Sequence, residues 1–364
     1  MVRSNGLRPA CLGLAALLLA PAAMAQGPAE CAREPDGPTR LACYDRLFRD
    51  TLPTAAPATG VAPAAAPAAP ATAVAPAVAP APPPAGDLAA ASETFTKAWE
   101  LTPQTKRGTF VVRTYLPNFV LPLHYSSSIN QAPASPTRGA VTGLPAYRSV
   151  DAKLQISLRA KIAQGLLLPD ADLWFAYTQR SFWQVWNSSQ SSPFRNTDYQ
   201  PEAIYVVPVP PSWSALPGGW RWRMAQLGLA HQSNGQGSAL SRSWNRVYAA
   251  AAFDRGEFGL TVRAHKRLRE RTDDDNPDLV RFVGNTEVVA TWLPGLATSS
   301  LTWRTHAPSG GRGSLQLDWT YPVLRSQPAG LRWYAQLFSG YGETLLDYNH
   351  RQTSLGLGLT LFQF

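Results

Sequence analysis

Apolar and polar residues alternate with a period of two along most of the chain from about Phe110 onward. The alternating segments are roughly ten residues long and are separated by clusters of turn-forming residues, a pattern typical of antiparallel strands. These clusters are residues 254–256, 273–277, 308–311 and 327–330. Candidate strands begin near Phe110, Ala152, Asp172, Glu202, Gly219, Arg242, Glu257, Asp278, Thr298, Gly313, Gly330 and Arg351. This even count predicts an all-β fold, a twelve-stranded antiparallel transmembrane β-barrel of the bacterial outer-membrane type.

Polar residues on one parity of the strands favour the barrel over a soluble alternative. Arg246 and Tyr248 share one parity of their segment, and Thr178, Arg180 and Gln184 share one parity of another. Such side chains suit the polar interior of a barrel better than a dry core. The alternative is an exported soluble β-sandwich with a tryptophan-rich core, acting as a carbohydrate-binding module.

The first residues have the three parts of a secretory signal peptide. Arg3 and Arg8 precede an apolar run over 11–20, and the small residues Ala23 and Ala25 follow it. We therefore predict a signal peptide over 1–25. The apolar run is too short to span a membrane as a helix, and no later stretch offers about 18 uncharged apolar residues.

Three further segments follow the signal peptide. Residues 26–50 form a small segment with helical spacing that contains Cys31 and Cys43, the only cysteines left after cleavage. In an oxidising compartment this pair is expected to form a disulfide, with two free thiols as the alternative. Residues 51–92 are an Ala/Pro-rich stretch, predicted to be a disordered linker of polyproline character. The barrel domain is assigned to 93–364.

The charge of the chain narrows its partners only slightly. Loss of Arg3 and Arg8 with the signal peptide lowers the net charge from +9 to +7, because no acidic residue leaves with them. Export argues against nucleic acid as the partner, so no nucleic-acid partner is expected. Anionic lipid headgroups or polysaccharide at a membrane surface fit better.

A candidate base and nucleophile stand two residues apart on one predicted strand. His231 and Ser233 share the parity of Leu227 and Leu229, so all four would lie on the apolar face. On a transmembrane strand this face points to lipid. An enzyme whose substrate is the membrane itself would have its reactive pair there.

The next strand supplies a third polar residue on the same face. Asn245 has the outward parity of its strand, and a hairpin between the two strands would bring it to the His231 imidazole. Its side-chain oxygen would then accept a hydrogen bond from one ring N–H, without adding a negative charge beside lipid. The turn containing Gly235 is a candidate source of backbone donors for an oxyanion.

Several blocks closely resemble the outer membrane phospholipase A family, in order, from about Phe110 to Phe364. The longest are His231-Gln-Ser-Asn-Gly-Gln-Gly-Ser-Ala-Leu-Ser-Arg-Ser-Trp-Asn-Arg246 and Tyr177-Thr-Gln-Arg-Ser-Phe-Trp-Gln184, the latter continuing through 187–195 and 199–202. Two shorter blocks, Asp274-Asp-Asn-Pro-Asp278 and Ser339-Gly-Tyr-Gly-Glu-Thr-Leu-Leu-Asp-Tyr-Asn349, match as well. The resemblance implies a twelve-stranded barrel that hydrolyses acyl esters of phospholipids, depends on calcium and acts as a homodimer. Ser233 would be the nucleophile, His231 the general base and Asn245 the residue that orients it.

The resemblance also implies a calcium site and a dimer contact. The ligands would be the Gln236 carbonyl, the Ser241 hydroxyl and, from a second copy of the chain, Ser191. Gln179 would pair across the dimer axis, because a lone amide facing lipid needs a partner. The alternative for Gln179 is a position near the headgroups with a bond to water.

The chain departs from the family pattern at Ser238, where the family can carry an acid alongside one that matches Asp275. A second, monomer-state calcium site is therefore not expected with Asp275, and residues 273–275 are expected to form a solvated turn. The remaining histidines, His124, His265, His306 and His350, are expected in loops or in the barrel interior.

The leading hypothesis is a calcium-dependent outer-membrane phospholipase that dimerisation activates. The rival is a passive outer-membrane barrel, a porin or scaffold without catalysis. A passive barrel has no reason to gather His231, Ser233 and Asn245 on its outer face.

Overall fold

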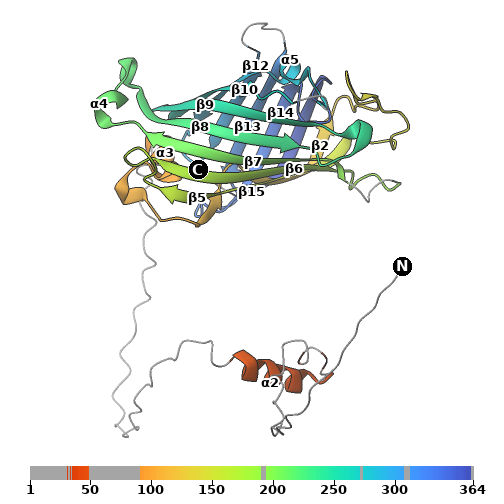
Figure 1. Ribbon diagram of the computed structural model, residues 1–364, viewed down its shortest axis with the longest axis horizontal. Helices are drawn as coiled ribbons and strands as arrows, with labels where there is room; N and C mark the ends of the chain where they lie inside the picture. The colour runs from red at the N-terminus through yellow and green to blue at the C-terminus, as the bar shows by residue number, and fades with distance from the viewer. Residues whose placement is uncertain are drawn as a thin grey trace, which may run out of the picture. The chain divides into compact units, whose positions relative to one another are not determined.

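The computed structural model describes residues 31, 33, 35–48, 91–189, 194–270, 274–306 and 312–361, which belong to two compact units, 1–77 and 78–364 (Figure 1). The predicted signal peptide, the predicted linker as far as residue 90, and Ser191 lie outside the described residues.

The first unit contains one described helix and a disulfide. Helix α2 spans Gly37–Phe48, and Asp36 stands just before it. The Asp36 carboxylate accepts hydrogen bonds from the backbone nitrogen and the hydroxyl of Thr39, which caps the helix start. Cys31 and Cys43 are joined with an S–S distance of 2.02 Å, so the predicted disulfide is confirmed.

The second unit is a closed antiparallel barrel. Its twelve strands are β2 (Asn118–Ser126), β5 (Val150–Gln164), β6 (Asp172–Trp183), β7 (Phe194–Pro208), β8 (Arg221–Ser233), β9 (Ser243–Arg255), β10 (Phe258–Arg267), β11 (Thr286–Trp292), β12 (Thr298–Thr305), β13 (Gly313–Pro322), β14 (Leu331–Gly340) and β15 (Gln352–Leu361). From β5 to β15 each strand pairs with the next along the chain, β15 then pairs with β2, and β2 pairs with β5, which closes the barrel. The predicted fold class is confirmed, and the β-sandwich alternative is wrong.

Short elements decorate the barrel. They are α3 (Ala91–Trp99), η2 (Pro103–Thr105), β1 (Val112–Thr114), β3 (Ala134–Ser135), β4 (Gly139–Ala140), α4 (Pro211–Ser214), η3 (Pro217–Gly219), η4 (Ser238–Leu240) and α5 (Leu279–Val283). Strand β1 pairs with β5 just beyond the stretch of β5 that pairs with β2, so the two short strands follow one line. Among the described residues, no helix combines the length and the apolar character needed to cross a membrane.

Three predicted strand starts are wrong. The first barrel strand, expected from Phe110, begins at Asn118, because residues 112–114 form the separate short strand β1. The strand expected from Glu202 begins at Phe194, and the one expected from Asp278 begins at Thr286. Asp278 instead precedes α5, whose Leu279 is fully buried. The apolar residues of this helix had been assigned to the strand.

The barrel is polar inside and apolar outside, as the alternation predicts. On β8, Leu227 and Leu229 are 60% and 52% exposed on the outer face, whereas Gln226 is 3% exposed and faces the interior. Arg246 and Tyr248 on β9 are likewise buried inside. Thr178, Gln184, Arg180 and His124 also lie in the interior, which agrees with their predicted placement.

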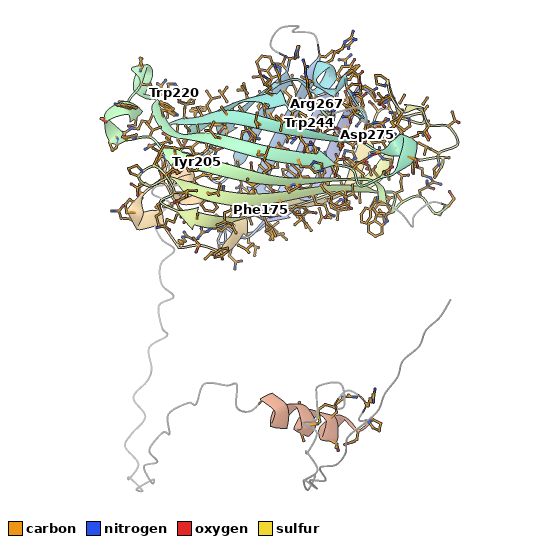
Figure 2. The ribbon with its side chains drawn as sticks, viewed as in Figure 1. Phe175, Tyr205, Trp220, Trp244, Arg267 and Asp275 are labelled. Atoms are coloured by element: carbon orange, nitrogen blue, oxygen red, sulfur yellow. A yellow bond between two sulfur atoms is a disulfide. The ribbon has the colours of Figure 1, made fainter. Side chains whose placement is uncertain are left out.

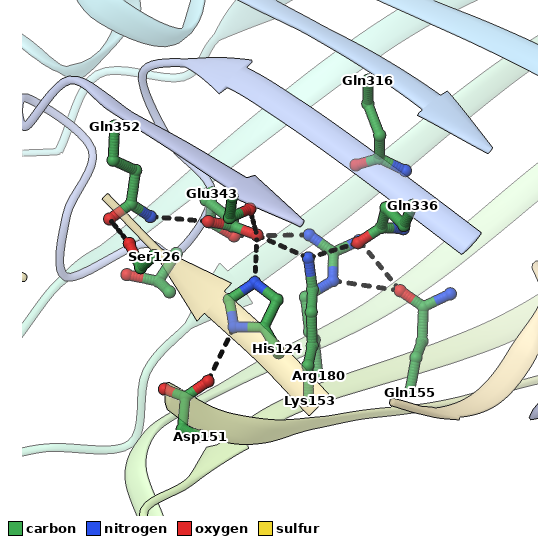
Figure 3. Close-up of polar contacts among 12 residues, drawn as sticks. His124, Ser126, Asp151, Lys153, Gln155, Arg180, Gln316, Gln336, Glu343 and Gln352 are labelled. Carbon is green, nitrogen blue, oxygen red and sulfur yellow. Dashed lines mark hydrogen bonds and ion pairs between the residues drawn. The ribbon is translucent and has the colours of Figure 1, made fainter. Parts of the chain in front are cut away.

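A buried ionic network fills the interior at one end of the barrel (Figure 3). Glu343, in the connection between β14 and β15, accepts hydrogen bonds from His124 (3.0 Å), Lys153 (2.7 Å), Gln352 (2.6 Å) and Ser354 (2.7 Å). A buried carboxylate needs such donors to offset its lost hydration. The network therefore holds the β14–β15 connection inside the barrel.

Helix α3 occupies the interior at the other end. The guanidinium of Arg159 stacks 3.9 Å from the centre of the Trp99 ring and donates to the carbonyl of Ala98 at 2.6 Å. A cavity of about 590 Å³ is lined by Phe95 and Trp99 of this helix and by Thr344 of the β14–β15 connection. In Figure 2 Trp220 marks the α3 and α4 end, and Asp275 marks the opposite end, which we call the loop end.

Candidate active site

In the β8–β9 hairpin, the candidate site residues of the two strands lie opposite one another at the loop end of the barrel. His231 lies directly opposite Asn245, and Ser233 lies directly opposite Ser243. All four have the outward parity of their strands. Directly opposed residues on one face of an antiparallel pair have Cβ atoms about 5 Å apart, close enough for side-chain contact.

A second cross-strand pair on the inner face supports this register. Gln232 lies between His231 and Ser233, and its side-chain oxygen accepts a 2.9 Å hydrogen bond from Trp244 Nε1. The Trp244 ring is buried, and the Arg246 guanidinium stacks 4.3 Å from its centre. If the register of a strand shifted by one residue, its inner polar residues would turn to the outer face and its site residues to the interior. The bonded inner pair therefore stabilises the register on which the outer pair depends.

The outer pair is hydrogen-bonded. Nδ1 of His231 lies 2.9 Å from Oδ1 of Asn245, so the approach expected from the hairpin is present. Because a side-chain amide oxygen only accepts, this contact puts the imidazole proton on Nδ1. Nε2 of His231 is then left without a proton and able to act as a base.

The loop after Ser233 turns tightly around a buried asparagine. Asn234 accepts hydrogen bonds from the backbone nitrogens of Arg242 (3.0 Å) and Gln236 (3.3 Å) and donates to the Leu240 carbonyl at 2.8 Å. These hydrogen bonds hold the two ends of the 234–242 loop together.

Gly235 needs to be glycine for two reasons. Its φ is +63°, which favours residues without a Cβ, and a Cβ there would lie 2.9 Å from the ring of Tyr199. Tyr199 of β7 lies opposite Ser233 of β8, so this ring packs beside the candidate nucleophile.

Ser241, a predicted calcium ligand, contacts a carboxylate. Its hydroxyl donates to Oδ2 of Asp275 at 2.5 Å, and Arg138 binds Oδ1 of the same residue through Nε at 2.7 Å. Asp275 is only 5% exposed, so the expectation of a solvated turn at 273–275 is wrong for this residue. Long-range pairing with Arg138, 137 positions away, draws the carboxylate inward.

Asp274 is also partly buried and binds Arg267 at 2.6 Å, whereas Asp273 lies outside the described residues.

The loop between β10 and β11 also reaches β9. The side chain of Asn276 accepts a 3.2 Å hydrogen bond from the backbone nitrogen of Ser243. Nδ2 of Asn245 donates to Oε1 of Glu270 at 3.1 Å. Burial raises the pKa of the Glu270 carboxyl, and Arg267 opposes that rise. Sequence reasoning missed Glu270 and Asn276, because only the fold brings their loop to β9.

An apolar cluster supports the loop from inside. It contains Trp244, Leu279, Leu345 and Tyr348, all buried. The hydroxyl of Tyr348 donates to Asp278 at 2.5 Å, which links the β14–β15 connection to the start of α5. Trp244 of the β8–β9 hairpin therefore packs against buried side chains that are themselves held in place.

The geometry brings a histidine, an asparagine and a serine together on the outside of a barrel. The sequence model of a family described as phospholipase A1 matches residues 95–361, the whole described barrel domain after the first residues of α3. The chain belongs to the phospholipase A1 family. It is therefore an enzyme, a phospholipase, and a purely passive barrel does not account for it.

Relatives of this phospholipase agree with that assignment. It is 36% identical over 364 residues to a putative phospholipase A1 of Neisseria meningitidis serogroup B, covering 95% of this chain and 94% of that protein. It is 34% identical over 218 residues to phospholipase A1 of Escherichia coli K12, covering 59% of this chain and 70% of that protein.

Solved structures of outer membrane phospholipase A share the fold. The Escherichia coli enzyme superimposes with a TM-score of 0.61 at 31% identity, covering 70% of this chain and all of that one. The Salmonella typhi enzyme, solved as a dimer with bound calcium, gives a TM-score of 0.61 at 30% identity, covering 71% of this chain and 94% of that one.

Gln179 of this phospholipase lies on the outer face of β6. Its side-chain oxygen accepts a hydrogen bond from the Tyr177 hydroxyl at 3.1 Å, and its nitrogen donates to the Ser181 hydroxyl at 3.3 Å. The amide was expected to need a partner from outside its own chain. Its neighbours on β6 already bind both ends, so the dimer contact stays a prediction, as does the role of Ser191.

Proposed function

We propose that the chain is a calcium-dependent outer-membrane phospholipase that hydrolyses acyl ester bonds of glycerophospholipids with Ser233, His231 and Asn245. The observation that carries this proposal is the 2.9 Å contact of His231 with Asn245 beside Ser233 on the outer face of the barrel. Family membership supports the ester-hydrolase chemistry.

In the proposed reaction, His231 Nε2 takes the proton of the Ser233 hydroxyl as its oxygen attacks the ester carbonyl. The carbonyl oxygen becomes an oxyanion, for which backbone N–H groups at Gly235 are the candidate donors. The lysophospholipid then leaves as an alcohol with the proton from His231, and the fatty acyl group remains on Ser233. A water molecule, deprotonated by His231, releases the fatty acid and restores the serine.

Asn245 has two roles in this proposal. Its oxygen orients the imidazole and stabilises the positive charge that develops on it during each proton transfer. As a neutral side chain it does so without placing a carboxylate next to lipid, where an unpaired charge is expensive.

The proposed location follows from the surface of the barrel. Exposed leucines such as Leu227 and Leu229 lie on the same outer face and the same strand as the pair His231 and Ser233. An apolar outer band with the reactive groups near its edge suits a membrane whose lipid esters approach from the side. We assign the loop end to the outer leaflet, because outer-membrane barrels carry their longer loops outside.

Calcium fits the residues beside the nucleophile. Hard cations prefer oxygen ligands, and the 234–242 loop offers the Gln236 carbonyl and the Ser241 hydroxyl. The Asp275 carboxylate at Ser241 is already paired with Arg138, so we assign no second calcium ion to it. When bound, the ion would stabilise negative charge that develops on the substrate. The calcium-bound dimer of the Salmonella typhi enzyme supports this choice of metal.

Dimerisation is proposed as the activating step. Gln179 would lie at the interface, and Ser191 of a second copy would complete the calcium ligands. Each site would then need both subunits, so a separated monomer would be dormant.

The test is fatty-acid release from phospholipid by the mature chain refolded in detergent, with calcium, with chelator, and for Ser233→Ala. Release should require calcium and vanish in the alanine variant. Ser243→Ala is the matched control, since it removes a hydroxyl from the position opposite Ser233 and should keep activity. Calcium-independent release, or full activity of Ser233→Ala, would overturn the mechanism.

A further inference from the structure

The amide of Asn245 is hydrogen-bonded at both ends. Its oxygen faces His231 Nδ1 at 2.9 Å, and its nitrogen donates to Oε1 of Glu270 at 3.1 Å. Glu270 follows β10, and its side chain is 19% exposed. The three side chains thus form a line from a carboxylate through an amide to the imidazole.

The carboxylate resolves an ambiguity that the amide has by itself. An asparagine can rotate by half a turn and present either its oxygen or its nitrogen to a neighbour. An ionised carboxylate has acceptors only, so it binds the amide through the nitrogen and rejects the oxygen. With the nitrogen held by Glu270, the oxygen must face His231, and the imidazole proton must stay on Nδ1.

The segment that carries Glu270 is held by contacts of its neighbours Arg267 and Leu268. The backbone nitrogen of Leu268 donates to the Asn245 carbonyl at 2.8 Å, which continues the β9–β10 pairing up to the loop. Arg267 lies 3.8 Å from Oε2 of Glu270 and binds Asp274 at 2.6 Å. Arg267 also donates to the backbone carbonyl of Asn276 at 2.5 Å. Glu270 therefore contacts Asn245 from a segment whose neighbouring residues are hydrogen-bonded to the rest of the barrel.

We propose that Glu270 is a positioning residue, which acts through Asn245 to keep His231 in the tautomer that can accept the serine proton. This inference rests on the proposed function of Ser233, His231 and Asn245. Without Glu270 the amide would sample both orientations, and in the reversed one its nitrogen would oppose the Nδ1 proton.

The first experiment compares Glu270→Ala with wild type in the refolded full chain. We expect kcat to fall about tenfold, the scale of one lost hydrogen bond to a charged group, with the KM for phospholipid unchanged. Glu257→Ala is the control, an exposed glutamate in the turn between β9 and β10 at the opposite end of the barrel. The folded fraction of each variant is measured by gel mobility without heating.

The second experiment is a double-mutant cycle that a merely structural role would not satisfy. Asn245→Asp alone puts a second carboxylate against Glu270, so like-charge repulsion should leave it poorly active. In Asn245→Asp combined with Glu270→Gln, the new amide can donate to the introduced carboxylate, and activity should rise about tenfold above that of Asn245→Asp alone.

Wild-type kcat in Glu270→Ala, or a double variant no more active than Asn245→Asp, would overturn the role of Glu270. If Glu270→Ala does not fold, the cycle with Glu270→Gln decides alone. Failure of the proposed function is separable from these outcomes, because it would appear as activity in Ser233→Ala.

Discussion

Gln179 and Ser233 lie in one cross-strand row on the outside of the barrel, joined by Tyr199 of the strand between them. Gln179 is paired with Tyr199 across β6 and β7, and Tyr199 is paired with Ser233 across β7 and β8. A second copy that covers Gln179 would therefore border the nucleophile. This places the proposed interface and the proposed chemistry within two strands of each other.

The Gln179→Ala variant should consequently dimerise less readily. Removal of the amide should leave the fold intact, because the buried Ser181 keeps its 3.0 Å hydrogen bond from the Thr197 hydroxyl and Tyr177 is only half-buried. It deletes the polar group that the resemblance assigns to the dimer axis. Chemical cross-linking across a calcium titration should show dimers at higher calcium than for wild type. Identical cross-linking of both proteins would argue against this interface.

The Ser241→Ala variant should raise the calcium concentration needed for half-maximal activity by about tenfold, since it removes one oxygen ligand from a small set. Calcium-dependent cross-linking should shift in parallel, which separates metal binding from a direct effect on catalysis. Ser243→Ala should shift neither curve. An unchanged calcium requirement would show that the Ser241 hydroxyl is no ligand.

The Asn245→Ala variant should lose about 100-fold in kcat while still folding and binding calcium. The imidazole would keep its place on β8 but would lose the acceptor that fixes its tautomer and stabilises its charged form. Steady-state hydrolysis of a soluble ester and of a phospholipid should fall together. A kcat near that of wild type would remove Asn245 from the triad.

Acid should destabilise the loop end only at low pH. Burial raises the pKa of the Glu343 carboxyl, but Lys153 and His124 lower it by more than burial raises it. The pKa therefore lies well below its ordinary value of 4.5. A depressed folded-state pKa means that this stabilisation is complete above pH 4.5 and disappears as the pH falls through the folded-state value.

In thermal unfolding of the refolded barrel, the stability that Glu343 contributes should therefore be lost only below pH 4.5. Glu343→Gln leaves Lys153 buried without its charge partner and should cost about 3 kcal/mol at neutral pH. Its stability should then depend less on acid than that of wild type. Equal acid sensitivity of the two proteins would contradict the assigned role.

Gly228→Ala should destabilise the barrel by about 2 kcal/mol through overpacking. A Cβ at Gly228 would overlap the ring of Tyr248, which lies against this position inside the barrel. Combined with Tyr248→Leu, the cost should be smaller than the sum of the two single changes. Gly237→Ala, where no atom lies within 4 Å of the added group, is the matched control for unfolding measurements.

The period-two pattern was enough to predict the barrel and the face on which the candidate site residues lie. Strand parity is local, so it assigned His231, Ser233 and Asn245 to one face, and a hairpin joins neighbouring strands with little freedom of register. For the same reason Arg246 and Tyr248 were placed correctly inside. The cysteine pair was predictable because residues 26–364 contain no other cysteine.

Contacts between distant loops were not predictable in this way. Asp275 is buried by Arg138, and Glu270 meets Asn245 because the β10–β11 loop folds back over β9. Neither the alternation nor the spacing along the chain encodes such a path. The short helix α5 was missed because a single apolar turn does not differ in pattern from the start of a buried strand.

Among the described residues of the loop between β10 and β11, the side chains of Glu270, Asp275 and Asn276 accept hydrogen bonds from Asn245, from Ser241 and from the backbone of Ser243, respectively. A cation bound at Ser241 and the imidazole held by Asn245 would therefore both depend on the conformation of this loop. If cation binding orders the loop, thermodynamic linkage requires that a loop ordered in advance binds the cation more tightly by the same free energy. Substitutions in the loop that contact neither lipid nor metal can thus change turnover and calcium requirement together.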